Sequence, residues 1–297
     1  MRAFFACSAA AIAAWAVGVS LGADRVAEHL KSENYTVKWG AARTFDRGAD
    51  LEIGDGAGHA FKLGWLRFKP GKGRVDVLSI DLNGGWHQYR SKWPPDLAPV
   101  SVKCARMNPD AYAALLHDLA RIDAAVLHPV EQDFVETSSQ DFWADIRLTA
   151  GKKTLVDVEW AGYWGTGDEV NFAKPQAAVA IGNAAVEGLE FKAHTPTPEE
   201  RAWASAKFAR DWKRMKGSES HWWVREEYIV MIGVAGDASA LPALRGPLAG
   251  EPKDRCAYFA VNAITRLTGK DVRDKPVEEM DVEKTRRRLI DTVWGGK

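Results

Sequence analysis

A five-residue segment with two prolines, His194-Thr195-Pro196-Thr197-Pro198, divides the sequence into two parts of different character. Proline lacks a backbone N–H and restricts the residue before it to extended conformations, so regular structure does not continue through this segment. Before it, alternating patterns separated by glycines predict strands, and after it apolar residues recur at helical spacing. We therefore expect an α+β domain over residues 24–195 and a small all-helical domain over residues 196–297.

The first part has the pattern of a mostly antiparallel sheet with helices. Two hairpins are expected, residues 59–68 with 74–82 and residues 141–149 with 154–160, and single strands at 35–39 and 100–106. Asn108-Pro109-Asp110 supplies the cap, the first-position proline and the first-turn acid of a helix. Its apolar stripe consists of Tyr112, Leu115, Leu116, Leu119 and Ile122. A short helix at 24–33 and an alanine-rich helix at 175–189, which we expect to lie on the sheet, complete this part.

The second part is predicted to be helical throughout. Thr197 and Glu200 form a capping box for a helix over 198–215. Further helices are expected at 222–233, 238–248 and 254–267. The segments from Val224 and from Asp254 are similar to each other at a spacing of about thirty residues, which is typical of stacked helical repeats.

The run from Gly233 to Leu244, GVAGDASALPAL, resembles the turn and second helix of a HEAT-type repeat. The resemblance covers about residues 220–297 and implies that Asp237 caps the second helix. It also implies that Leu241 and Leu244 face Ala257, Ala260 and Leu267 across a helix pair. Such a fold serves many functions, and one and a half repeats are too few to fold alone, so these helices are expected to bury surface against the rest of the chain.

Residues 1–23, MRAFFACSAAAIAAWAVGVSLGA, have one early positive charge, an apolar run and small residues before Asp24. This pattern predicts a cleaved secretory signal peptide and an exported, periplasmic or extracellular protein. An uncleaved membrane anchor is the alternative, because the apolar stretch from Ala3 to Leu21 is 19 residues long and just reaches spanning length. In that case the chain would meet the membrane through this segment alone.

The charge balance and the residue types of the chain argue against several classes of binding partner and cofactor. The chain has 40 basic and 40 acidic residues, and such a balance gives no electrostatic basis for nucleic-acid binding. No His or Cys pair has metal-ligand spacing, no phosphate loop is present, and no cofactor is expected. After removal of the signal, Cys104 and Cys256 remain; we expect two separate buried thiols, with a disulfide as the alternative.

Two aromatic-rich segments are the candidate binding loops. Residues 84–95 carry Trp86, His87, Tyr89 and Arg90, and residues 160–169 carry Tyr163, Trp164, Asp168 and Glu169. Aromatic faces beside hydrogen-bonding groups suit sugar rings or peptide side chains, although most Trp rings simply fill cores. An enzyme would pair His87 with Asp168 or Glu169 as acid and base and use Arg90 as an anion clamp.

No established catalytic motif supports that pairing, so no catalytic residue is assigned. The sequence favours an exported, non-catalytic binding or scaffolding protein that docks an unknown protein partner on its helical-repeat surface. The alternatives are envelope polysaccharide binding by the two aromatic loops and, third, an envelope hydrolase.

Overall fold

The computed structural model describes residues 35–57, 62–82, 100–129, 141–163, 169–215, 222–248, 255–271 and 281–295. They form an α+β fold around a seven-stranded antiparallel sheet. The strands are β1 (Tyr35–Trp39), β2 (Asp50–Ala57), β3 (Lys62–Gly71), β4 (Arg74–Leu82), β5 (Val100–Met107), β6 (Ala125–Pro129), β7 (Asp141–Ala150), β8 (Lys153–Tyr163) and β9 (Lys192–Ala193). The helices are α3 (Pro109–Ala124), α4 (Glu169–Val186), α5 (Pro198–Met215), α6 (Trp222–Ala235), the 3-10 helix η2 (Ala238–Ala240), α7 (Leu241–Leu248), α8 (Arg255–Thr268) and α9 (Val282–Trp294).

The large sheet has the strand order β8-β7-β2-β3-β4-β5-β9, and β1 pairs with β6 in a separate ribbon. Both predicted hairpins are confirmed, β3 with β4 and β7 with β8. Their turns contain Gly73 at φ 75° and Gly151 at φ 58°, and this left-handed conformation costs glycine little because it has no Cβ.

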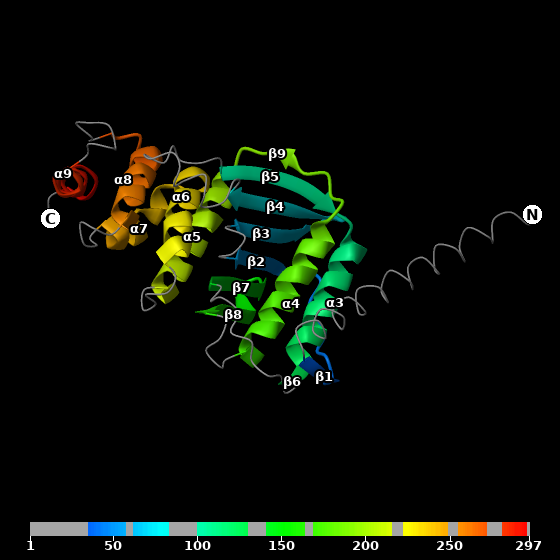
Figure 1. The fold of residues 1–297 in the computed structure, drawn as a ribbon. Coiled ribbons are helices and arrows are strands. Elements are labelled where there is room, and N and C mark those ends of the chain that lie inside the picture. The colour runs from blue at the N-terminus through cyan, green and yellow to red at the C-terminus, as the bar shows by residue number, and fades with distance from the viewer. Residues whose placement is uncertain are drawn as a thin grey trace, which may run out of the picture.

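The sheet has helices on both faces (Figure 1). Helices α3 and α4 cover one face, α5 and α6 lie on the other, and α7, α8 and α9 lie beyond them. The α3/α4 face buries one apolar core, which includes all five residues of the predicted α3 stripe and β-strand residues such as Leu51, Phe68 and Val77. Asn108 caps α3 as expected, because its Oδ1 accepts the Asp110 N–H at 2.8 Å.

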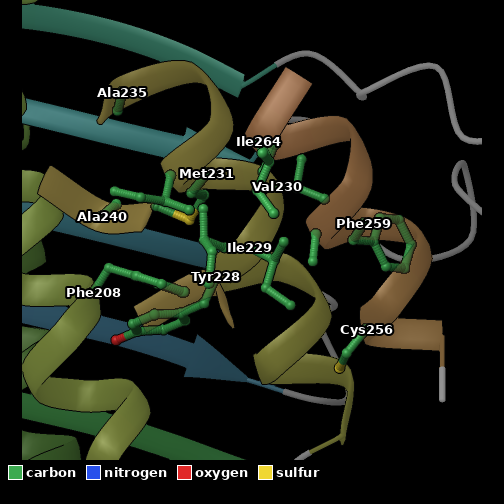
Figure 2. Close-up of a cluster of buried hydrophobic side chains, with 14 of the residues drawn as sticks. Phe208, Tyr228, Ile229, Val230, Met231, Ala235, Ala240, Cys256, Phe259 and Ile264 are labelled. Atoms are coloured by element: carbon green, nitrogen blue, oxygen red, sulfur yellow. The ribbon is translucent and has the colours of Figure 1, made fainter. Parts of the chain in front are cut away.

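The second core is shared between the sheet and the residues after Pro198. Trp65, Leu78 and Ile80 from the sheet belong to the same buried cluster as Phe208 and Tyr228 from the helices. Figure 2 shows the helical side of this cluster, with Tyr228 and Phe208 next to each other. The rings of Trp65 and Tyr228 meet edge to face, with centroids 4.9 Å apart, so the helices bury apolar surface against the sheet.

The helical part begins and packs largely as its sequence predicts. Thr197 and Glu200 form the expected capping box, in which each accepts the other's backbone N–H at 3.3 and 2.7 Å. Asp237 caps η2 by accepting the Ser239 N–H. The predicted helix over 238–248 is divided into η2 and α7, and Leu244, Ala257 and Ala260 are buried in the shared core.

The structure differs from the sequence predictions in several strands and in the start of one helix. Strand β2 and the short strands β6 and β9 are not predicted, and α4 begins at Glu169, six residues earlier than expected. Residues 1–23 and the helix predicted at 24–33 lie outside the described residues. Among the helices that are described, none combines the length and apolarity needed to span a membrane. Cys104 and Cys256 form no disulfide; Cys256 is buried as expected, whereas Cys104 is only half-buried.

Candidate functional site

Most residues of the two predicted binding loops lie outside the part of the chain that the structure describes. This applies to Trp86, His87, Tyr89, Arg90, Trp164 and Asp168. The loop predicted over 160–169 is shorter than expected, because Trp160 to Tyr163 extend strand β8 and Glu169 begins α4. Strand β8 continues there because its end pairs with the start of β7, with Tyr163 opposite Asp141.

The strands that precede the two loops end at the same end of the sheet. Leu82 at the end of β4 pairs with Val100, and Tyr163 at the end of β8 pairs with Asp141. Three strands, β3, β2 and β7, separate β4 from β8, so the two chain segments leave the sheet about 19 Å apart at the usual strand spacing.

A pocket of about 200 Å³ lies between this end of the sheet and α4. Its lining combines polar and apolar side chains from β2, β3, β4, β5 and α4, together with Phe191: Ile53, Asp55, Gly64, Leu66, Ser79, Asp81, Lys103, Asn183, Val186 and Phe191. Because strand side chains alternate between faces, these residues share the α3/α4 face. Pockets with a partly apolar lining and a few convergent polar groups are the usual form of small-molecule sites.

The floor of the pocket is a row of three residues on neighbouring strands. Asp55 pairs with Gly64, and Gly64 pairs with Asp81. The two aspartates therefore point to the same face with a glycine between them, and their Cα atoms are about 9–10 Å apart at two strand spacings. A Cβ atom added to Gly64 would lie 3.0 Å from Asp81 Oδ1, so the missing side chain keeps the space between the two carboxylates open. We call this row the Asp-Gly-Asp row.

Neighbouring polar groups hold the two carboxylates in place. Ser79 Oγ donates to Asp81 Oδ2 at 2.7 Å, and Asn183 Nδ2 donates to Asp55 Oδ2 at 3.2 Å. Lys103 lies directly across from Ser79 on β5 and makes no ion pair with the residues that the structure describes. The pocket lining thus combines two positioned carboxylates with one lysine.

Helix α4 comes close enough to the sheet to form the back of the pocket. Gly182 faces Ile53, and a Cβ at this glycine would overlap the Ile53 side chain. The close approach brings Asn183, the next residue of α4, within hydrogen-bonding distance of Asp55. A glycine inside a helix is normally destabilising, so its position here is explained by this packing.

The opposite face of the sheet carries a buried charge cluster, which we name the Lys207 cluster: Glu52, Asp145, Lys207, Arg210 and Asp211. Lys207 is fully buried, and its Nζ donates to Asp145 at 2.5 Å and to Asp211 at 2.9 Å. Arg210 donates to Glu52 at 2.8 Å and to Asp211 at 3.1 Å. The cluster joins α5 to strands β2 and β7 across the interface.

The contacts of the Lys207 cluster indicate a structural role. Burial lowers the pKa of Lys207, but the attraction of Asp145 and Asp211 outweighs burial and holds that pKa above its ordinary value. Tyr228 donates a further hydrogen bond to Asp211 at 3.0 Å, and Trp203 donates to Glu52 at 2.9 Å. A buried ion pair of this kind is costly to break on one side, because removing one partner leaves the other charge uncompensated.

A third unusual group is Glu227 on α6, which is 3 % exposed. Neither of its carboxyl oxygens has a hydrogen-bond partner within the described part of the chain. Burial, with a smaller contribution from the adjacent Glu226, raises its pKa to about 8. Glu227 is therefore a neutral carboxylic acid below that pH.

The described residues contain no group of three or more His, Cys, Asp or Glu side chains arranged to hold a metal ion. Comparisons with protein families, with curated proteins and with solved structures find no match to this chain. The function of the candidate site is therefore inferred from its geometry alone.

Sequence reasoning missed both the pocket and the Lys207 cluster. Asp55, Gly64 and Asp81 are far apart in the sequence, and only the strand register places them in one row. Lys207 and Asp211 are four residues apart on a helix, a spacing that equally describes an ordinary exposed ion pair. The alternation of Ser79 and Asp81 with apolar residues in β4 was a usable signal, because it places polar side chains on a face that is otherwise buried.

Proposed function

We propose that this chain is an exported, non-catalytic binding protein that holds a small polar ligand in the pocket between the sheet and α4. The observation that carries the proposal is the pocket itself, in which Asp55, Ser79, Asp81, Lys103 and Asn183 converge on about 200 Å³ of space. Polar side chains that converge on a partly apolar pocket supply both orientation and affinity for a small molecule.

Binding fits the pocket better than catalysis does. Among the described residues, its lining contains no His, Cys or Tyr, the residue types most used as general base or nucleophile beside carboxylates. Ser79 is 5 % exposed and donates its hydroxyl hydrogen to Asp81. This hydrogen bond orients the carboxylate, and the burial of Ser79 limits its access to a substrate.

Export is the second element of the proposal, supported by the apolar run and small residues of residues 1–23. N-terminal sequencing of the protein from its native host is expected to begin at or near Asp24. An intact Met1 in a membrane fraction would instead show that the segment is a retained anchor.

The helical part, which resembles a HEAT-type repeat, serves in this proposal as the support of the sheet. Its helices α5 and α6 bury apolar and charged side chains against the sheet, so this side of the helical layer is not open to another protein. The docking surface expected from the sequence would then have to lie on the outer helices α8 and α9.

A ligand screen tests the binding proposal. The melting temperature of the mature protein is measured in the presence of small amines, carboxylates, aminocarboxylates or neutral sugars. A ligand at 100 times its Kd stabilises a protein by about 2.7 kcal/mol, which such a melt detects. We expect at least one class to raise the melting temperature and Gly64→Ala to remove the increase. Gly71→Ala, on the same strand, is the matched control, because its new Cβ would meet only Arg74 O at 3.6 Å. No increase with any class, or one that Gly64→Ala leaves intact, would overturn the proposal.

Envelope polysaccharide binding is the second candidate, favoured by the observation that β4 and β8 both end at the same end of the sheet. The two aromatic segments would then form one surface for several sugar rings. Co-sedimentation with insoluble polysaccharide should be reduced by Trp86→Ala and by Trp164→Ala, while Gly64→Ala should leave it unchanged. Retained co-sedimentation in both Trp variants would remove this candidate.

A further inference from the structure

We infer that the ligand of this pocket is a short aminocarboxylate with an aliphatic body, the chemical class of the apolar α-amino acids. The inference rests on the proposed function and adds to it the charge pattern of the site. Three features carry it: the open space between two carboxylates, the ammonium of Lys103, and the apolar remainder of the lining.

The ligand's ammonium group is placed over Gly64 in the Asp-Gly-Asp row. Asp55 and Asp81 are paired with Gly64 on either side, and Asp81 Oδ1 lies 3.0 Å from the position of its missing Cβ. Ser79 and Asn183 each donate to one of the two carboxylates, and these bonds hold both groups in position before a ligand arrives. An ammonium has three donors and suits a site with several carboxylate oxygens around it.

The ligand's carboxylate is placed at Lys103. This residue stands across from Ser79, one strand beyond Asp81, and lines the pocket from β5. Within the described residues it has no ion-pair partner. Two carboxylates and one ammonium give the polar lining a net charge of −1. A zwitterionic ligand does not change this net charge when it binds. Its ammonium faces the two carboxylates, and its carboxylate faces the ammonium of Lys103.

The remaining lining sets the size and polarity of the rest of the ligand. Ile53, Leu66, Val186 and Phe191 form the apolar part of the wall. At roughly 30 Å³ per water molecule, 200 Å³ corresponds to about seven waters. A single aliphatic amino acid fits this space, and a sugar chain does not.

The test compares l-leucine with two molecules that each lack one of its charges, isoamylamine and isocaproate. Isothermal titration calorimetry of the full mature chain is expected to give a Kd on the order of 1–100 µM for l-leucine, which is what so few ligand atoms allow. Both truncated molecules should bind at least about tenfold more weakly, because each leaves a charged protein group without its partner.

Pocket variants assign each charge. Asp81→Asn should weaken l-leucine and isoamylamine alike, whereas Lys103→Met should weaken l-leucine at least about tenfold and leave isoamylamine unchanged. The matched controls are Asp76→Asn, an exposed aspartate on the same strand, and Lys153→Met, an exposed lysine on β8. Neither control should alter either affinity, and thermal melts show whether each variant is folded.

The outcomes separate this inference from the proposed function. If a neutral sugar or a simple carboxylate binds, if Gly64→Ala abolishes that binding, and if l-leucine does not bind, the ligand class is wrong and the pocket remains a binding site. Equal binding of l-leucine by the wild type and Lys103→Met would also overturn the placement of the carboxylate. If no probe of any class binds, both the ligand class and the proposed function fail.

Discussion

Replacing Glu227 by glutamine should make the protein more resistant to alkaline pH. Glu227 is 3 % exposed on α6, and its carboxyl oxygens have no hydrogen-bond partner among the described residues. In the unfolded chain its pKa takes the ordinary value of 4.5, and burial raises it to about 8 in the folded protein. The folded state therefore holds a proton that the unfolded state releases between these two pH values.

The size of the effect follows from that difference. Between pH 4.5 and about 8 the folded state binds more protons at this site, so the free energy of unfolding falls as pH rises. Each pH unit contributes at most 1.36 kcal/mol, which gives about 4 kcal/mol between pH 4.5 and 7.5. The contribution of Glu227 to the free energy of unfolding is complete below pH 4.5 and is lost by about pH 8. Glutamine is neutral at every pH, so its contribution does not fall as the pH rises.

Urea unfolding of the wild type and Glu227→Gln at half-unit steps from pH 4.5 to 8 measures this difference. We expect the variant to gain stability relative to the wild type steadily, reaching about 4 kcal/mol near pH 7.5. The pH dependence that other buried acids contribute is the same in both proteins and cancels in the difference. Glu187→Gln, at an exposed position, is the control for the change from carboxylate to amide. A difference that stays constant over the whole range would refute a buried, proton-bearing Glu227.

Three further perturbations test the packing of the helical part. Leu244→Ala removes a side chain with no exposed surface, so chemical denaturation should show a loss of about 2–5 kcal/mol; a loss below about 0.5 kcal/mol would place Leu244 on the surface. Lys207→Met removes the ammonium that pairs with two buried carboxylates, Asp145 and Asp211, and we expect a loss of about 3–5 kcal/mol in the same assay; an unchanged midpoint would contradict the Lys207 cluster. Residues 196–297 alone should lack a cooperative thermal transition by circular dichroism, because their core includes Trp65, Leu78 and Ile80 of the sheet; a sharp transition would show that the helices fold by themselves.

The elements that the sequence predicts well are those whose signals are local. Asn108 with Pro109 marks the start of α3, and the capping box of Thr197 marks the start of α5, because the atoms that form each cap are within three residues of one another. The glycines of the hairpin turns act in the same way, since a left-handed residue fixes the turn and thereby the register of the strands beside it.

Strand β2 shows the limit of such reasoning. Its sequence, DLEIGDGA, contains two glycines and two aspartates, residue types that are depleted in strands. It is a strand because β3 and β7 pair with it on both sides, and the alternation of Leu51 and Ile53 alone was too short to predict it.

The sequence by itself determined the α+β class, the turns, the caps and the helical character of the described residues after Pro198, since each depends on contacts between near neighbours in the chain. Only the tertiary structure decided the candidate site. Asp55 and Asp81 meet across Gly64 because three strands pair in one register, and a shift of one residue would turn these side chains to the other face. The burial of Lys207 against Asp145 likewise depends on how α5 packs on the sheet, which no local pattern specifies.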